Sequence, residues 1–351
     1  MGANLIPRSI ISRYKRKGEE MRMLFPFCAV VALILLACGG VKIANLQFLF
    51  GIVIPYAAIA AFILGCIYRV VKWGSLPVPF RIPTTCGQQK SLPWIAPDKF
   101  GNPSTASGVL GRMLVEVLLF RPLFRNTKTE MIPGSRAVYG SDKWLWLAGL
   151  ALHYSFLVVL LRHIEFFAQP IPSYLDYVKS VDGFFEIGVP RLFMSGALLL
   201  VSVTYLFVRR VYLPQVRYIS LAADYFPLLL LMAIAVTGIL MRYFFMVDLV
   251  SVKVLTLGLV HFSPVVPEGI GTIFYVHIFL VSILVAYFPF SKLMHMGGIL
   301  LSPTLNMANN SRMLRHVNPW NYPVHVHAYA DYEDEFRKKM TEAGIPVEKK
   351  E

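Results

Sequence analysis

The sequence predicts an all-α membrane protein with six transmembrane helices. Its composition favours this class, because 56% of the 351 residues are apolar, only 15% are charged and the mean hydropathy is +0.58. Soluble domains carry about 25% charged residues, so a water-soluble enzyme is excluded. The chain also contains six apolar stretches, each long enough to cross a hydrocarbon core of about 30 Å, which takes roughly 20 helical residues.

The first two stretches lie close together, at about 23–41 and 47–70. A basic segment precedes the first, as in a secretory signal, but the apolar run is too long for a signal and has no clear small-residue cleavage site before Val41. We therefore expect it to be retained as a helix. The other four stretches lie at about 144–167, 191–212, 225–246 and 270–290.

A long Pro/Gly-rich loop, residues 72–143, separates the second and third stretches. Near its end, apolar residues recur at helical spacing, and Arg112 and Glu116 are four residues apart, as in a stabilising ion pair. This segment is too short to span a membrane and ends in basic residues. It therefore predicts an interfacial helix on the inner leaflet. The repeating residues are Val109, Leu110, Met113, Leu114, Val117 and Leu118.

The distribution of basic residues predicts the orientation of the helices. With the N-terminus inside, the inner segments hold all but six of the 34 basic residues, and the remaining six are Lys42, Arg162, Lys179, Arg191, Arg242 and Lys253. Lys and Arg concentrate on the cytoplasmic side of membrane proteins. We expect both termini to be cytoplasmic in a multi-pass protein of the cell membrane. The formal charge of +14 is spread between apolar stretches, so a nucleic-acid partner is not predicted.

Four of the eight histidines lie in predicted helices: His153 and His163 in the third stretch, His277 and His295 in the sixth and its inner extension. Ionisable groups at membrane depth indicate function. The two helices run in opposite directions, so the topology matches His163 with His277 near the outer face and His153 with His295 near the inner face. A single membrane histidine is as often an interhelical hydrogen-bonding group as a metal ligand. Two histidines on each of two helices, however, favour metal ligation.

The axial spacings of the histidines differ on straight helices. His153 and His163 are about 15 Å apart, whereas His277 and His295 are about 27 Å apart on one helical face. For both pairs of histidines to meet, one of the two helices must therefore be tilted or bent. Pro289 lies between His277 and His295, and we expect it to kink the helix.

The chemistry of such pairs favours haem over a bare metal ion. Two imidazoles with no thiolate or carboxylate nearby leave too few protein ligands for tetrahedral zinc, whereas a tetrapyrrole supplies the other four donors. The two pairs thus predict two b-type haems, one near each membrane face. Haem propionates favour basic partners, and Arg242, near the outer end of the fifth stretch, is the candidate at the outer haem.

These histidine spacings resemble those of the dihaem cytochrome b gamma subunit of respiratory nitrate reductase, over about residues 47–296. The extra first helix, the long loop and the longer tail depart from that pattern. The loop segments "RIPTTCGQQKSLPWI" and "NPSTASGVLGRMLVEVLLFRPLFRNTK" resemble the DsrM family, the membrane cytochrome b subunits of sulfite-reduction-associated DsrMKJOP complexes, which are heterodisulfide-reductase-like menaquinol-oxidising enzymes.

The resemblance implies a domain organisation and a set of partners. A basic tail and extra first helix (1–45) would precede the dihaem domain (46–296), with a cytoplasmic C-terminal tail (297–351) after it. Electrons from menaquinol would leave through a cytoplasmic iron–sulfur subunit resembling the catalytic subunit of heterodisulfide reductase. Further implied partners are a multihaem cytochrome c, an iron–sulfur protein and a second membrane subunit.

By the same resemblance, quinol would bind near the outer haem. Glu165, two residues beyond His163, is then a candidate proton acceptor, and Lys179 is a candidate partner of a quinone carbonyl, although either residue is more often simply solvated. Two other classes of protein remain open. A secondary transporter or proton channel would use the histidines as a proton relay, and a structural anchor would not need them.

Overall fold

The computed structural model describes residues 8–76, 98–133, 136–183, 191–309 and 327–349. Within these residues, six helices are long and apolar enough to cross a membrane, and each corresponds to one predicted stretch, which confirms the predicted fold class. The six candidate spans are Met21–Lys42, Leu49–Gly74, Lys143–Phe166, Met194–Tyr212, Ala222–Tyr243 and Thr272–Phe290. The segment "RIPTTCGQQKSLPWI" lies outside the described residues.

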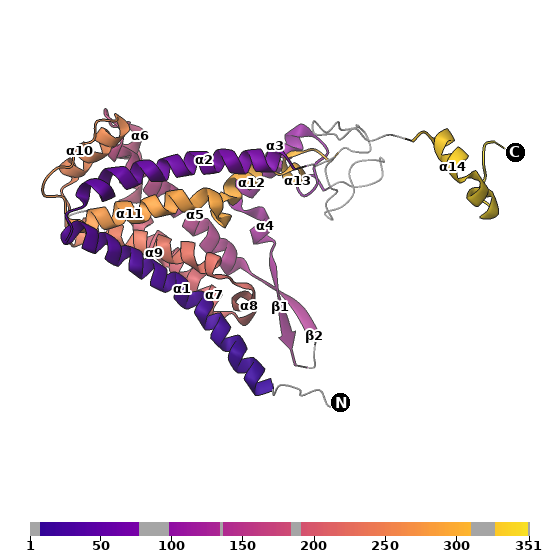
Figure 1. Cartoon of the computed structure of the whole chain (residues 1–351), viewed down its shortest axis with the longest axis horizontal. Coiled ribbons are helices and arrows are strands. Elements are labelled where there is room, and N and C mark those ends of the chain that lie inside the picture. The colour runs from indigo at the N-terminus through magenta and orange to yellow at the C-terminus, as the bar shows by residue number, and fades with distance from the viewer. Residues whose placement is uncertain (1–7, 77–97, 134–135, 184–190, 310–326, 350–351) are drawn as a thin grey trace.

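The elements follow one another in the chain as Figure 1 labels them. The first part forms α1 (Arg8–Lys42), a π-helical turn (Leu49–Val53), α2 (Ile54–Gly74), α3 (Ala106–Leu119), α4 (Arg121–Phe124), β1 (Thr127–Ile132) and β2 (Arg136–Ser141). The middle part forms α5 (Lys143–His163), α6 (Tyr174–Asp182), α7 (Met194–Tyr212), α8 (Pro214–Ile219), α9 (Ala222–Tyr243) and α10 (Leu249–Val260). The last part forms α11 (Thr272–Tyr287), α12 (His295–Leu301), α13 (Pro303–Asn306) and α14 (Tyr329–Glu342).

The spanning helices form one bundle. In it, α5 packs on α7, α7 on α9, α9 on α11 and α11 on α2, while α1 packs against α9 and α11. Helices α6 and α10 lie at one end of the bundle, and α3, α12 and α13 lie at the other (Figure 1). From the predicted orientation, we call these the predicted outer end and the predicted inner end.

The apolar core lies between α1, α9, α10 and α11. Its fully buried side chains include Tyr225 and Leu230 of α9, Leu255 of α10 and Tyr275 and Leu280 of α11. At 12 residues α10 is about 18 Å long, too short to span the membrane, and it packs into the core from the predicted outer end. This short helix was not predicted.

Helix α3 forms where the sequence predicts a helix, and its Arg112–Glu116 pair faces the protein. Arg112 and Glu116 are buried and joined at 2.9 Å, and Arg112 also donates to the Thr304 carbonyl of α13 at 3.3 Å. Leu110 and Leu114, by contrast, are more than half exposed. The polar pair thus attaches α3 to the bundle, and the apolar face remains open, as expected of a helix that rests on lipid.

The sixth span is broken rather than kinked, which corrects the prediction for this region. Helix α11 ends at Tyr287 and is followed by two 3₁₀ turns, Phe288–Phe290 and Lys292–Met294, on either side of Ser291, which is extended with φ −112° and ψ 179°. Pro289 has no N–H to continue the helical hydrogen bonds, and the Ser291 hydroxyl caps the second turn by accepting from Leu293 N–H at 3.1 Å. His295 therefore begins a separate helix, α12, and the separation calculated for one straight helix does not apply.

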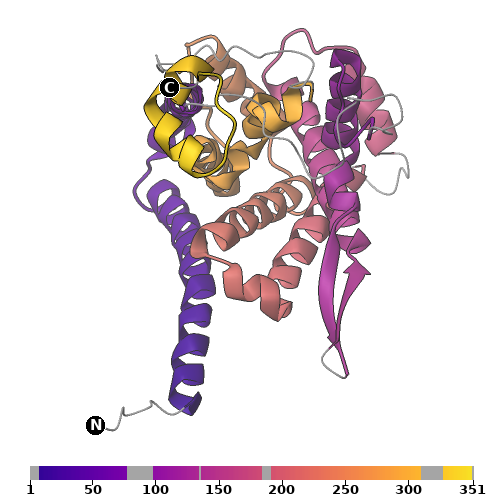
Figure 2. The same cartoon turned by 90° about the vertical axis from the view of Figure 1, so that its right-hand side faces the viewer.

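A β-hairpin precedes α5 and was not predicted. Its strands β1 and β2 pair antiparallel with Thr127 opposite Ser141, and the hairpin extends away from the helices (Figures 1 and 2). Helix α3 is tied to α5 just beyond this hairpin, because Trp146 and Tyr154 donate to the Leu119 and Leu118 carbonyls at 2.8 and 3.0 Å. These bonds satisfy the free carbonyls at the end of α3.

Candidate functional site

The four membrane histidines meet in two pairs, each between α5 and the α11–α12 segment. His163, the last residue of α5, faces His277 of α11, with ring centroids 6.4 Å apart and ring planes inclined by 15°. His153 faces His295, with centroids 5.9 Å apart and planes inclined by 88°. The structure therefore brings together the same partners that the predicted topology matches.

Each histidine has one ring nitrogen held by a hydrogen bond. The Nδ1 atoms of His153 and His163 lie 2.7 Å from the carbonyl oxygens of Gly149 and Val159, one turn earlier in α5. The Nδ1 atom of His295 lies 3.0 Å from the Lys292 carbonyl. A carbonyl only accepts, so Nδ1 carries the proton in these three rings, and Nε2 keeps a free lone pair.

His277 has a side-chain partner instead. Its Nδ1 lies 2.9 Å from the Thr237 hydroxyl, which in turn donates to the carbonyls of Ala233 and Ile234 in its own helix. The hydroxyl proton is committed to those carbonyls, so its oxygen accepts from Nδ1–H. Gly238 follows directly, and a Cβ there would lie 3.3 Å from His277 Cε1, so α9 approaches this ring closely. Thr237 was not predicted as a contact of this ring.

The junction of α3 and α4 covers the predicted inner pair. Phe120 adopts a left-handed conformation, with φ 49°, which non-glycine residues rarely adopt. Its ring packs edge-on against His153, with centroids 4.9 Å apart. Such a strained residue persists only where its surroundings hold it, and it is often found at functional sites. The sequence contains no signal for this contact.

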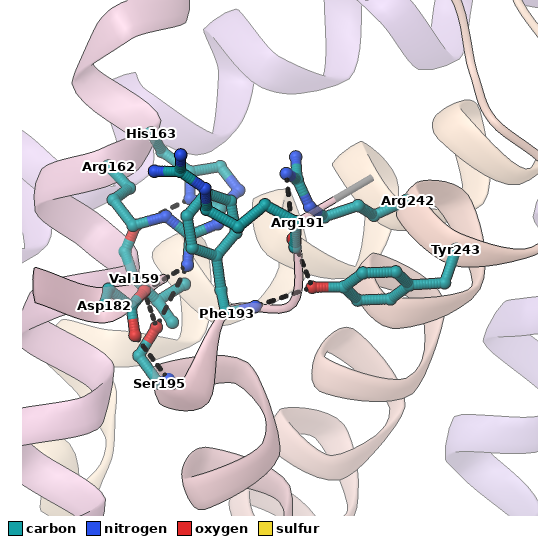
Figure 3. Close-up of polar contacts among 9 residues, drawn as sticks. All are labelled: Val159, Arg162, His163, Asp182, Arg191, Phe193, Ser195, Arg242 and Tyr243. Atoms are coloured by element: carbon teal, nitrogen blue, oxygen red, sulfur yellow. Dashed lines mark hydrogen bonds and ion pairs between the residues drawn. The ribbon is translucent and has the colours of Figure 1, made fainter. Parts of the chain in front are cut away.

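A polar cluster adjoins the predicted outer pair (Figure 3). Asp182, at the end of α6, accepts from Arg162 Nη1 at 2.6 Å, from Ser195 N–H at 2.7 Å and from the Ser195 hydroxyl at 2.6 Å. The guanidinium carbons of Arg162 and Arg242 lie 3.4 and 4.2 Å from the Phe193 ring centroid. The cluster ties together the ends of α5, α6, α7 and α9, directly beside His163.

Glu165 and Lys179 form an ion pair with each other. Glu165 lies in the 3₁₀ turn after α5, and Lys179 lies in α6, and about a quarter of each side chain is exposed. The two residues were predicted as separate contacts of a quinol. The structure pairs them with each other at the predicted outer end, and Glu165 lies two residues beyond His163.

Three basic side chains near the predicted inner end have acidic partners. Arg209 is joined to Asp142 at 2.5 Å, and Asp224 accepts from Lys292 at 2.6 Å and lies 3.8 Å from Arg210. On sequence alone, Arg209 and Arg210 at the inner end of the fourth stretch could equally be propionate partners or ordinary interfacial residues. These ion pairs tie the start of α5, the end of α7 and the start of α9 to the break before α12.

Comparison with known proteins places this arrangement in a family. The nitrate reductase gamma subunit family matches residues 113–311, which include all four histidines. The chain is 45% identical over 280 residues to the Hdr-like menaquinol oxidoreductase cytochrome b-like subunit of Archaeoglobus fulgidus, covering 78% of this chain and 83% of that one. It is 42% identical over 277 residues to the protein of the same description from Archaeoglobus profundus, covering 76% and 81%. The chain therefore belongs to the nitrate reductase gamma subunit family, together with these cytochrome b-like subunits.

Proposed function

We propose that this chain is a dihaem b membrane subunit that carries electrons from menaquinol across the membrane to a cytoplasmic iron–sulfur subunit. The proposal depends on the two pairs of facing histidines. In each of the four rings, Nδ1 is hydrogen-bonded to a protein oxygen. The relatives' description as cytochrome b-like subunits of menaquinol oxidoreductases supports the haem and the quinol.

The residues present fit a bis-imidazole haem. Two imidazoles that bind one metal ion from opposite sides, through bonds of about 2 Å, have centroids about 6 Å apart. The observed separations are 5.9 and 6.4 Å. Within the described residues, no three His, Cys, Asp or Glu side chains converge, so the donors at each pair are the two imidazoles alone. A tetrapyrrole supplies the four donors that such a pair leaves open.

The protein residues would hold and tune these groups. Bound haem supplies reversible one-electron transfer. His163 and His277 would hold the outer haem, and His153 and His295 the inner one. The Nδ1 hydrogen bonds fix each ring's tautomer and orientation, and they raise the basicity of Nε2. Arg242 remains our candidate propionate partner at the outer haem.

We propose that quinol binds at the predicted outer end, beside the Glu165–Lys179 pair. The glutamate would accept a proton from the quinol hydroxyl, and the lysine would contact a quinone oxygen. Glu165 lies two residues beyond His163 and is paired with Lys179, so the proposed proton acceptor and electron acceptor would be close together. Protons would then leave outward while electrons move inward.

The organisation of the complex is also part of the proposal. Both termini and the loop at 72–143 would face the cytoplasm, where the tail after residue 297 would be either a solvated appendage or a surface for a partner subunit. The link to sulfite reduction and the other subunits of a DsrMKJOP-type complex rest on the sequence resemblance alone. The segments 1–45, 46–296 and 297–351 remain our proposed divisions.

A reduced-minus-oxidised visible spectrum of the detergent-purified protein tests the central proposal. We expect b-type bands and two haems per chain by pyridine haemochrome assay, and reduction of these bands by a menaquinol analogue in the purified complex. A secondary transporter or proton channel that uses the histidines as a proton relay would be colourless. A protein that folds and inserts without haem would contradict the proposal.

The Thr237 contact gives a narrower prediction. We expect Thr237→Val to weaken haem binding at the outer site by about 10- to 100-fold, because the residues that orient metal-bound histidines contribute about that much to affinity. Haem retention during extended detergent dilution measures the loss. The matched control is Ser202→Ala in α7, whose hydroxyl donates to the Leu199 carbonyl of its own helix. Equal retention in the two variants would contradict the role of Thr237.

A further inference from the structure

In the part of the chain that the structure describes, two arginine side chains have a buried Nε atom without a hydrogen-bond partner: Arg69 in α2 and Arg242 in α9. Within the described residues, neither forms an ion pair, whereas Arg162 is paired with Asp182 and Arg209 with Asp142. An arginine cannot lose its charge in a protein, and a buried charge is costly unless it is paired. Both arginine residues are only partly buried, but each has a buried Nε and no acidic partner among the described residues, so each guanidinium group can bind an anion.

Arg242 lies one turn outward from the predicted outer histidine pair. Thr237 and Gly238 of α9 contact His277, and Arg242 follows Gly238 by four residues on the same face of the helix, about 6 Å further along the axis. Its Nη2 donates to the Arg191 carbonyl at 3.3 Å, and its guanidinium stacks on Phe193. These contacts hold the group in place and leave its charge uncompensated.

The neighbouring carboxylate of Asp182 does not neutralise Arg242, because it is already bound to other groups. Asp182 already accepts from Arg162 and from the backbone N–H and hydroxyl of Ser195, all at 2.6–2.7 Å. Arg162 and Arg242 both lie over the Phe193 ring, and Asp182 pairs with Arg162. Counted over the described residues, the outer cluster therefore carries an excess positive charge at Arg242.

Arg69 has the corresponding position at the predicted inner pair. Gly65, one turn before it, faces Pro289 and Phe290, where the sixth span breaks. Trp73, one turn after it, lies against Gly297 and Gly298 of α12. Residues four apart share a helix face, so Arg69 faces the segment between these contacts, and His295 lies in that segment. The guanidinium carbon lies 5.7 Å from the Trp73 ring centroid.

We propose that Arg69 binds a carboxylate of the group held by His153 and His295, as the counterpart of Arg242 at the other pair. This inference rests on the proposed function, because a haem at each pair brings propionate carboxylates. The planar guanidinium fork matches a carboxylate, and charge-assisted hydrogen bonds of this kind are roughly twice as strong as neutral ones. Each pair of histidines would thus have its own arginine, one on α2 and one on α9.

Redox titration of the two haems in Arg69→Gln and Arg242→Gln tests the proposal. Loss of the guanidinium leaves the propionate charge uncompensated, and that charge favours ferric iron. We expect Arg69→Gln to shift the reduction equilibrium of the inner haem about tenfold toward the ferric form, equivalent to about 59 mV for one electron, and to leave the outer haem unchanged. Arg242→Gln should do the reverse, and lysine at either position should restore most of the potential.

The matched controls are Lys72→Gln on α2, whose side chain is exposed and stacks on Tyr68, and Lys253→Gln on α10. Potentials in Arg69→Gln that equal those in Lys72→Gln would overturn the proposal. An anionic lipid phosphate would offer Arg69 similar chemistry. A shift that appears only in nanodiscs containing phosphatidylglycerol, and not in phosphatidylcholine alone, would assign the anion to lipid and also overturn it. Wild-type protein without haem would instead overturn the proposed function.

Discussion

Replacing either histidine of a pair should remove one haem and leave the other in place. We expect His163→Ala and His277→Ala to lose the same outer haem, and His153→Ala and His295→Ala to lose the inner one, because a haem held from both sides loses a bond to iron in each case. The ring separations of 6.4 and 5.9 Å are the physical basis for these two couples. The measurement is haem content together with low-temperature reduced spectra, which resolve the two bands.

Double variants sharpen this prediction. His163→Ala combined with His277→Ala should be no worse than either single change, since residues that act as one unit have non-additive effects. The matched control is His261→Ala at the end of α10, where Nδ1 lies 2.9 Å from the Leu257 carbonyl, as in the candidate ligands. That control should keep both haems. Loss of the inner haem in His277→Ala would break the assignment of the pairs.

The six spans and the histidine couples could be predicted from the sequence because each depends on a simple periodic signal. A run of about 20 apolar residues can satisfy its backbone in lipid only as a helix. Once the directions of two helices are known, the order of their histidines follows. The pairing of His163 with His277 could therefore be predicted without knowledge of the side-chain packing.

The parts that sequence reasoning missed depend on contacts between distant residues. The break at Ser291 could not be distinguished from a proline kink, because it also needs the Ser291 cap and the packing of Gly65 against Pro289. The buried polar face of α3 depends on the Thr304 carbonyl, 192 residues away from Arg112. Arg69 was not predicted as a site residue, because its position depends on the segment opposite α2.

The second large effect that we expect is on stability, and it comes from substitution of Asp182 in the polar cluster beside His163. We expect Asp182→Ala to lower the free energy of unfolding by about 3–5 kcal/mol, because removal of one partner from a buried pair leaves an uncompensated charge. Only 4% of the Asp182 side chain and 14% of the Arg162 side chain are exposed, so solvent does little to screen the remaining guanidinium. Thermal and denaturant unfolding followed by tryptophan fluorescence measure the change.

Two further variants separate the charge effect from simple loss of packing. Asp176→Ala, an exposed position of the same helix α6, should change the stability by less than about 0.5 kcal/mol, as surface substitutions usually do. Adding Arg162→Met to Asp182→Ala should recover much of the loss, because the uncompensated guanidinium is then gone and apolar replacements of buried ion pairs are often neutral or stabilising. If the double variant is no more stable than Asp182→Ala, the cost comes from the Ser195 hydrogen bonds that start α7. The ion pair with α5 would then contribute little.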